Sequence, residues 1–371
     1  MVKKCNICGN KLIKNGKTKS GKQRWYCKKC KGSQALKYDK TIKKFKQFIN
    51  WLLKKNALSE QNVPARTLSR NNRLYWKYWA MPSIYDEEID VLYIDGTYLK
   101  RSACILIACT KDHVINWYVA RSENSKSWKA MLIRIPKPKV VVTDGGNGVL
   151  KAINEIWPDV VIQRCIYHIQ MQIIRCTTNN PKLNAGKELL LLARLLGKIK
   201  TYEQASKWID AYLEWTFKWE EFLKEKSRDE YGNWMYKHRQ LRKARRAINK
   251  VLSSDNLFTF VDPLYEFDFA IPSTNNRLEG GVNSQIKSLI RHHRGMPLER
   301  RIKAIYWWCY YHSPYIENPE YLLKHMPTDE DIKEIYVHME KNEQLESEIE
   351  QWGDAIVWSE FHNYDKWFYQ W

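Results

Sequence analysis

The chain has 371 residues, of which 44% are hydrophobic, so it can build two or three domains with real cores and is not a peptide scaffold or a disordered tail. Its 62 lysines and arginines outnumber the 41 acids, and 22 of them, against two acids, fall in the first 80 residues. This concentration of positive charge indicates a polyanionic partner, with nucleic acid favoured over an anionic membrane. The sequence shows neither the apolar leader of a secreted protein nor the ~18 apolar residues of a membrane span, so we expect a cytoplasmic, nucleoid-associated protein without membrane attachment.

Two cysteine pairs of matching spacing open the chain, within residues 1–38. Cys5 and Cys8 form one Cys-x2-Cys pair and Cys27 and Cys30 form the other, with 18 residues between the pairs. Each pair can offer two thiolates to one tetrahedral Zn2+ from a tight turn. Four unrelated thiols and a redox dithiol are the alternatives, but redox chemistry does not need a second matched pair. We therefore predict a zinc ribbon with a structural Zn2+, because four protein ligands leave no position open for a substrate.

Residues 39–82 carry apolar residues at helical spacing, first from Ile42 to Leu52 and then from about Pro64 to Trp79. Two short basic helices in this order suggest a helix-turn-helix-like DNA-binding module, although a helical linker with a solvated basic face would leave the same pattern. The cations expected to contact DNA from this module are Arg66, Arg70, Arg73 and Lys77.

From residue 88 the composition changes to short β-branched runs, which predict five strands within residues 88–180. The runs cover Val91–Ile94, Ala103–Thr110, Val114–Val119, Val140–Thr143 and Val160–Gln163, with helical patterns at Lys126–Arg134 and Gly148–Trp157. The first three runs follow one another closely enough for an antiparallel meander. Helices separate the later strands, so the predicted fold class is α/β, with a mixed sheet and helical crossovers.

Three acids stand where a phosphoryl-transfer site would need them. Asp95 and Asp144 each precede a glycine at the predicted end of a strand, the edge at which α/β sheets place their ligands. A single Asp-Gly is usually only a turn, but two at matching strand ends can share metal ions. A pair of Mg2+ ions needs a third acid, and Glu279, in the first turns of a predicted helix, is the candidate. Taken alone, Glu279 would be a surface acid that complements the helix dipole.

A combination of motifs resembles a known family. The motifs are the strand ends at Asp95 and Asp144, the segment Gln163-Arg164-Cys165-x2-His168, and Asn276-x2-Glu279. Together they resemble the RNase H-like DDE transposases of the bacterial Mutator-like group, over about residues 88–312. The resemblance implies an RNase H-like mixed sheet, interrupted by an all-helical insertion at residues 181–260 and completed by residues 261–312.

The same resemblance implies roles for individual residues. In that family three acids carry two divalent ions, Mg2+ or Mn2+, and this role falls here on Asp95, Asp144 and Glu279. The resemblance places His168 close to the active site, where we expect it to assist the positioning of DNA or metal. Cys165 and His168 alone cannot close a zinc site, so Cys165 is expected to be a buried packing residue.

The predicted insertion is rich in aromatic and basic residues. Its tryptophans Trp208, Trp215, Trp219 and Trp234 favour core packing, with the stacking of unpaired bases as the alternative. Its basic run favours contact with the DNA backbone. A second cluster beyond the helix of Glu279 is placed to neutralise phosphate, or else to complement a helix C-terminus. The residues expected to contact DNA in these two clusters are Arg242, Arg245, Arg291 and Arg294.

Residues 313–371 form an acidic, aromatic C-terminal segment, in which 14 acids face four bases from residue 316 onward. The opposite charges of the two chain ends suggest that this segment docks on a basic surface of its own or of a neighbouring subunit. Its aromatic end argues against simple disorder. We expect an oligomerisation or regulatory segment, to which the family resemblance does not extend.

The resemblance implies a DNA transposase that binds the terminal inverted repeats of an insertion sequence, cleaves DNA with two metal ions and transfers the freed 3′-OH to target DNA. Its expected partner is double-stranded DNA, at element ends and target. Because two ends must be brought together, we expect a homodimer or a larger synaptic assembly. The alternatives are a non-catalytic DNA-binding regulator, disfavoured because all three acids are present, and an RNase H-like nuclease, which would leave the zinc ribbon and the insertion unexplained.

Overall fold

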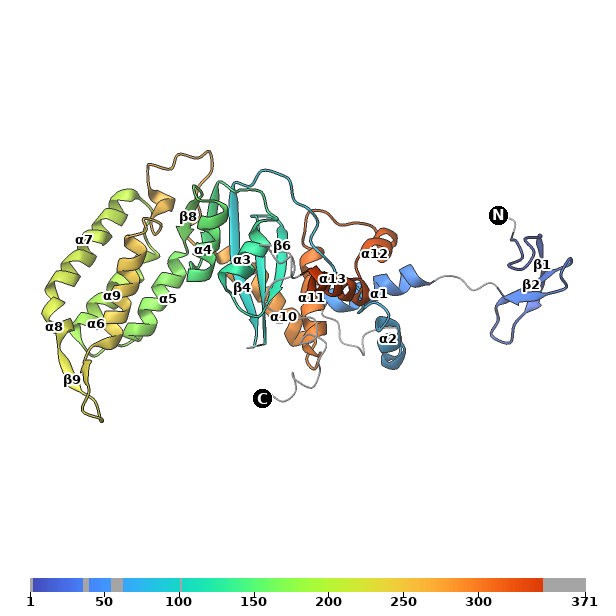
Figure 1. Cartoon of the computed structure of the whole chain (residues 1–371), viewed down its shortest axis with the longest axis horizontal. Helices are drawn as coiled ribbons and strands as arrows, with labels where there is room; N and C mark the ends of the chain where they lie inside the picture. The colour runs from blue at the N-terminus through green and yellow to red at the C-terminus, as the bar shows by residue number, and fades with distance from the viewer. Residues whose placement is uncertain (1–2, 36–39, 55–62, 101, 343–371) are drawn as a thin grey trace.

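The computed structural model describes residues 3–35, 40–54, 63–100 and 102–342 (Figure 1). Its first unit is an antiparallel sheet of β1 (Leu12–Lys17), β2 (Gln23–Cys27) and β3 (Ser33–Ala35), in that order. The buried cluster beneath it is small and consists of Cys5, Leu12 and Cys27, with Cys8 and Trp25 packed against it. So small a core needs a cross-link to be stable.

The helices α1 (Thr41–Leu53) and α2 (Ala65–Asn72) follow. Phe45 and Phe48 of α1 are fully buried, and their ring centroids lie 5.4 Å and 6.4 Å from that of Trp307, in the distant helix α11 (Leu298–Tyr310). Figure 1 shows α1 beside α11. The helices expected within residues 39–82 are therefore present, but α1 shares one hydrophobic core with the C-terminal part of the chain.

A five-stranded sheet forms the centre of the chain, in the order β6-β5-β4-β7-β8. Its strands are β4 (Val91–Leu99), β5 (Ala103–Cys109), β6 (Val114–Ala120), β7 (Val140–Thr143) and β8 (Val161–Arg164). β5 pairs antiparallel with β4 and β6, whereas β7 pairs parallel with β4 and β8. The expected mixed α/β sheet is confirmed. One detail was wrong: β4 runs on to Leu99, so Asp95 lies in the middle of this strand rather than at its end.

Helices cover both faces of the sheet. α3 (Ser125–Leu132) and α4 (Asn147–Ile156) share a buried cluster with Leu92 and Ile94 of β4. α10 (Ser284–His292) and α11 share the other cluster, which contains Tyr93 of β4. Because strand side chains alternate between the two faces, this double coverage explains why every residue of β5 is buried.

Between β8 and α10 the chain builds a helical unit with its own core. Its helices are α5 (Ile166–Thr177), α6 (Asn184–Leu196), α7 (Tyr202–Lys218), α8 (Glu220–Lys224) and α9 (Arg239–Leu252). Trp208 and Trp215 are buried in this core, each stacked on Tyr212, as expected for packing residues. The expectation of an all-helical insertion was wrong, because β9 (Lys226–Arg228) and β10 (Trp234–Tyr236) form an antiparallel hairpin at its outer end (Figure 1).

Where the chain leaves this insertion, it makes hydrogen bonds to β8. Thr259, in the short helix η2 (Thr259–Val261), donates a hydrogen bond to the Ile162 carbonyl. The side-chain amide of Gln163 donates to the Leu257 carbonyl at 2.9 Å and accepts from the Phe260 N–H at 3.0 Å. These bonds tie the returning end of the insertion to β8, the strand from which the insertion starts. A π-helical segment, η3 (Arg277–Asn283), then leads into α10.

The first part of the acidic C-terminal segment is folded onto the body of the protein, as α12 (Pro319–His325) and α13 (Asp329–Asn342). Asp329 accepts hydrogen bonds from Lys303 Nζ at 2.6 Å and from Trp79 Nε1 at 2.8 Å. Residues 343–371, which include the aromatic end, lie outside the described residues. Within the described ranges, no helix has the length and apolar character that a membrane crossing requires.

Candidate active site

Two of the predicted acids meet at one edge of the central sheet. β4 and β7 pair in parallel, and their last paired residues are Ile94 and Thr143. Asp95 and Asp144 are the next residues along the two strands, so they lie side by side where β7 ends. At this edge of α/β sheets the carboxyl ends of parallel strands present ligand-binding residues.

The side chain of Asp95 is held by hydrogen bonds to both of its oxygens. The Gly96 N–H donates to Oδ1 at 2.9 Å, and Asn283 Nδ2 donates to Oδ2 at 2.7 Å. Thr97 donates in turn to Asn283 Oδ1 at 2.6 Å, which fixes the orientation of the amide. Asn283 was not among the predicted residues, although it lies four positions after Glu279 in the same helical segment.

Asp144 opens a glycine turn that is shaped around an arginine. Gly145 has a φ of +73°, which disfavours any residue with a side chain, and a Cβ there would also overlap the guanidinium of Arg164. Arg164 ends β8 and is only 8% exposed. Burial lowers the pKa of its guanidinium, while the charge of Asp144 acts in the opposite direction. This buried cation therefore offsets part of the negative charge at the edge of the sheet.

A fourth carboxylate, Glu123, lies at the same site and was missed by the sequence analysis. A Cβ on Gly96 would overlap Glu123 Oε1, so the Glu123 side chain fills the space over Gly96, next to Asp95. Cys104 Sγ contacts the same oxygen at 3.7 Å. Glu123 follows β6, so an acid just after a predicted strand was the sequence signal that could have identified it.

The carboxylates of this edge repel one another. Burial, followed by the charges of Asp144 and Glu123, raises the pKa of Asp95 to about 7. Burial, followed by the charge of Asp144, raises the pKa of Glu123 to about 7 as well. Glu279 also contributes to the shift of Asp95, as a smaller cause. Such a group of partly buried acids is stabilised by protons or by a bound cation.

Glu279 lies in η3, where it contacts the Cys165-x2-His168 pair. Its Oε1 lies 3.2 Å from His168 Nδ1 and 3.6 Å from Cys165 Sγ. The ligand atoms of these three residues all lie within 4.8 Å of one another, whereas in the described part of the chain Asp95 and Asp144 form no such cluster, either with Glu279 or with Glu123. The structure thus places Asp144 and Glu123 near Asp95, and Glu279 beside them in contact with His168.

Cys165 joins the elements that carry these residues. Its N–H donates to the Thr143 carbonyl at 2.8 Å, and its sulfur accepts from the Asn275 N–H at 3.2 Å. Asn275 Nδ2 donates to the Ile94 carbonyl at 3.0 Å. Burial raises the pKa of the Cys165 thiol to about 11, so it stays protonated at neutral pH. As expected, Cys165 is a buried packing residue, and it anchors the start of α5 against β7.

The four N-terminal cysteines form a separate cluster that could hold zinc. Their ligand atoms all lie within 4.8 Å of one another, and Sγ atoms approach to 3.4 Å in the pairs Cys5–Cys30 and Cys8–Cys27. Zn–S bonds of about 2.3 Å give a tetrahedron with edges of roughly 3.8 Å, close to these separations. Backbone N–H groups of Ile7 and Cys8 lower the pKa of Cys5, and the Asn10 N–H lowers the pKa of Cys8 to about 6, which favours the thiolate at these two positions. The neighbouring thiols of Cys5 and Cys27 raise the pKa of Cys30 to about 12.

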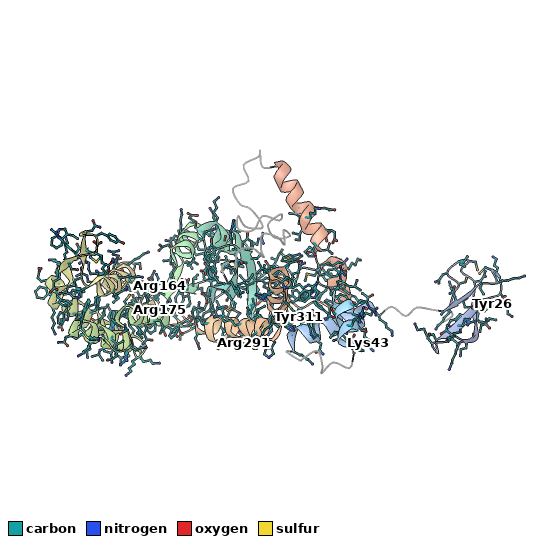
Figure 2. All side chains as sticks on the ribbon, turned by 90° about the horizontal axis from the view of Figure 1, so that it is seen from below. Tyr26, Lys43, Arg164, Arg175, Arg291 and Tyr311 are labelled. Atoms are coloured by element: carbon teal, nitrogen blue, oxygen red, sulfur yellow. The ribbon has the colours of Figure 1, made fainter. Side chains whose placement is uncertain are left out.

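The cations predicted to contact DNA fall into two classes. Six are exposed, namely Arg66, Arg70, Arg73 and Lys77 around α2 and Arg291 and Arg294 at the end of α10. Arg242 and Arg245 of α9 are half-buried, and Arg242 packs 3.5 Å above the ring of Tyr236 and donates to the Leu223 carbonyl. Figure 2 shows Arg164 where the sheet meets the insertion, and Arg291 on α10.

Comparison with known proteins bears on the segment that carries this site. Residues 91–172 match the family described as the MULE transposase domain. Over 215 residues the chain is 26% identical to the transposase for insertion sequence element IS905 of Lactococcus lactis subsp. lactis (strain IL1403). The aligned region covers 53% of this chain and 47% of the relative. The chain thus spans about half the length of this curated relative. The central part of the chain is therefore similar to the MULE transposase domain, and over about half of its length the chain is similar to the transposase of an insertion sequence.

Proposed function

We propose that the chain is a DNA transposase, which binds the terminal inverted repeats of an insertion sequence, cleaves strands at the element ends and transfers the freed 3′-OH to target DNA. The observation that carries this proposal is the meeting of Asp95 and Asp144 at the end of paired parallel strands, within the segment that matches the MULE transposase domain. The order of three antiparallel and two parallel strands supports an RNase H-like catalytic core.

The donor set at this edge fits Mg2+ or Mn2+. Both ions prefer carboxylate oxygens, and the raised pKa values of Asp95 and Glu123 reflect a charge that a cation would offset. Asp95, Asp144 and Glu279 would hold the ions, with Glu123 as a fourth carboxylate. Two such ions, when bound, lower the pKa of the attacking oxygen and stabilise the leaving oxygen of an in-line displacement at phosphorus.

The protein's own residues supply orientation. Gly96 and Asn283 hold both oxygens of Asp95, and His168 and Cys165 both contact Oε1 of Glu279. Because phosphoryl transfer by this route needs no covalent enzyme intermediate, positioning and charge are the whole contribution required of the side chains. The zinc ribbon and the exposed cations around α2 are proposed to bind the inverted repeats.

A strand-transfer assay tests the proposal. The substrate is pre-cleaved DNA from the ends of the element that encodes the chain, with Mg2+ or Mn2+ and a second duplex as target. Asp144→Ala and Glu279→Ala should each reduce joined product by at least about a hundredfold, since each removes a metal ligand. Glu155→Gln, an exposed carboxyl on α4, is the matched control.

The outcomes separate the candidate functions. Cutting without joining by the wild-type chain would indicate a nuclease, and binding without either reaction would indicate a regulator. Joined product that survives Glu279→Ala would remove Glu279 from the metal ligands and leave Glu123 as the third acid.

A further inference from the structure

The hairpin of β9 and β10 presents a face of alternating aromatic and basic side chains. Trp234 lies opposite Arg228 and Tyr236 opposite Lys226, so these four side chains share one face, while Ser227 and Met235 share the other. The guanidinium of Arg228 lies 5.0 Å from the centre of the Trp234 ring, and Lys226 Nζ lies 5.4 Å from that of Tyr236. The cations are thus already placed beside the rings.

The rings on this hairpin are unusually accessible. Trp234 is 65% exposed and Tyr231, in the turn, is 87% exposed. In the part of the chain that the structure describes, Trp234 is the one exposed tryptophan, although Trp208 and Trp215 of the same insertion are 3% exposed. The expectation of core packing therefore fails for Trp234, and an exposed aromatic pair beside cations suggests a binding surface.

Two acids near the hairpin, Asp229 and Glu225, make structural contacts, and a third, Glu230 in the turn, is exposed. Asp229 accepts backbone hydrogen bonds from Tyr231 and Asn233 and so shapes the turn, in which Gly232 has a φ of +83°. Glu225 contacts Lys237 and His238, both at 3.2 Å. Lys226, Arg228 and Arg239, at the start of α9, are exposed and outnumber the exposed Glu230, so an anionic partner meets a net positive surface here.

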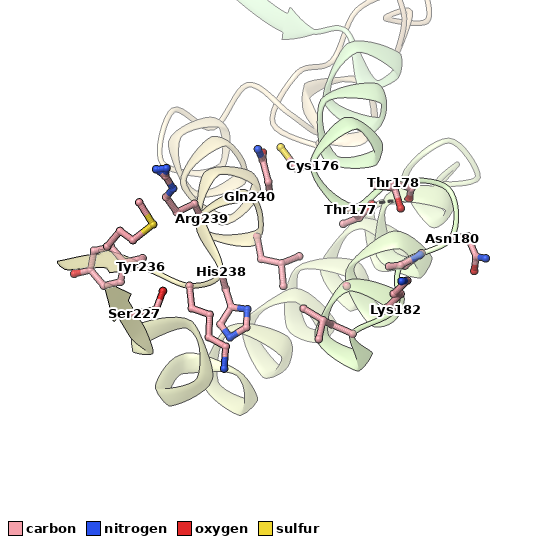
Figure 3. A pocket seen from close by; sticks show the side chains of 16 residues that line it. Cys176, Thr177, Thr178, Asn180, Lys182, Ser227, Tyr236, His238, Arg239 and Gln240 are labelled. Atoms are coloured by element: carbon pink, nitrogen blue, oxygen red, sulfur yellow. Dashed lines mark hydrogen bonds between the residues drawn. The ribbon is translucent and has the colours of Figure 1, made fainter. Parts of the chain in front are cut away.

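The other face of the hairpin borders a cavity of about 730 Å³ (Figure 3). Met235 and Leu241 supply apolar lining, and Lys182 and Arg239 supply positive charge, while the charge of Lys237 is offset by Glu225. This volume falls within the range of sites for small organic ligands. The hairpin is therefore flanked by a cationic hollow large enough for a nucleotide that has left the base stack.

We propose that this hairpin binds single-stranded DNA, with unpaired bases stacked on Trp234 and Tyr231 and phosphates held by Lys226, Arg228 and Arg239. Stacking on aromatic faces and a cationic groove are the two elements of sequence-independent single-strand binding. The surface is linked to the catalytic edge by α9, whose Lys250 donates to Asn147 at 2.5 Å, three residues after Asp144. The inference rests on the proposed function, because strand cleavage and joining produce unpaired DNA near that edge.

Fluorescence anisotropy with the full chain tests this inference. The probes are a fluorescein-labelled oligothymidine of about 20 nucleotides and a mixed-sequence duplex of the same length, without divalent metal so that no cleavage occurs. The double variant that combines Tyr231→Ala with Trp234→Ala should bind oligothymidine at least about fivefold more weakly and bind duplex unchanged. Trp234→Phe should retain most of the affinity, since it keeps an aromatic face.

The matched control is Tyr202→Ala, which removes another exposed aromatic ring from the same insertion, at the start of α7. Equal weakening toward duplex would overturn the assignment to unpaired DNA. Unchanged oligothymidine binding would overturn the proposal, and with a simultaneous loss of dimer in light scattering it would assign the hairpin to contact between protein copies. Because the assay involves no cleavage, its failure is distinguishable from failure of the strand-transfer experiment.

Discussion

Four carboxylates, one arginine and one histidine lie near one edge of the central sheet, and each has a physical reason for its place. Gly96 lacks a side chain, which leaves room for Glu123 beside Asp95, and Gly145 leaves room for Arg164 beside Asp144. An alanine in place of Gly96 would collide with the carboxylate of Glu123, and an alanine in place of Gly145 would collide with the guanidinium of Arg164. The two glycines therefore shape the site as directly as the acids do.

The raised pKa values of Asp95 and Glu123 predict how stability depends on pH. Both carboxyls bind protons more tightly in the folded chain, so their contribution is full below about pH 4, falls as the pH rises toward 7 and stays lost above it. Glu123→Gln removes one repelling charge and should raise the midpoint of thermal unfolding at about pH 8 without metal by about 2–4 °C. Mn2+ should stabilise the wild-type chain at this pH, and the Glu123→Gln chain less.

Scanning calorimetry at about pH 5 and about pH 8, with and without Mn2+, measures both effects. Glu155→Gln again serves as the control, because this acid lies on the outer side of α4 in a contact with Lys129. If the Glu123→Gln chain showed the wild-type midpoint and the wild-type response to Mn2+, Glu123 would have no part in the site.

The sequence could identify only some of these residues. Asp95 and Asp144 stand out because each follows a β-branched run and precedes a glycine. Glu123 follows β6 without such a pattern, and only the folded chain shows that it turns over Gly96. Arg164 belongs to the motif that runs from Gln163 to His168. Its place beside Asp144, however, depends on the pairing of β7 with β8, which no local pattern encodes.

At the scale of elements, burial decides what could be predicted. β5 and β7 are buried throughout, so they appear as continuous apolar runs and were placed correctly. The strands β9 and β10 have three residues each and exposed ends, so they leave no such run, and an all-helical insertion was expected instead. The packing of α1 on α11 joins residues more than 240 positions apart, as between Phe45 and Trp307, and was equally invisible to local pattern.

The contacts that attach α13 to the rest of the protein predict that stability is sensitive to substitution of Asp329. Lys303 is fully buried with two acid partners at 2.6 Å, Glu299 and Asp329. Asp329→Ala removes one partner and the acceptor of Trp79 Nε1, and should destabilise the chain by about 2 kcal/mol, less than full loss of a buried pair because Glu299 remains. Chemical denaturation measures the change. Glu334→Ala, on an exposed position of the same helix, should alter stability by less than about 0.5 kcal/mol, and an equal effect of both variants would contradict the role of the buried pair.

At the scale of the whole molecule, the segment with the excess positive charge is separate from the segment that carries the carboxylates. The first 80 residues carry most of the excess charge, and the carboxylate edge lies on the central sheet. The N-terminal sheet keeps its own small buried cluster, whereas α1 shares a buried cluster with the central sheet. Loss of zinc should therefore unfold the ribbon alone.

A cysteine substitution tests this separation. Cys8→Ser removes one of four ligands, and the chain should fall from one bound zinc ion to none, measured by elemental analysis, because structural zinc contributes about 10–16 kcal/mol to such a small fold. Binding of element-end DNA should weaken, while the main unfolding transition should stay within about 1 °C, since the ribbon shares no buried cluster with the sheet. Cys176→Ser, outside the cluster, should keep its zinc. A large shift of the main transition in the Cys8→Ser chain would show that the ribbon stabilises the catalytic part.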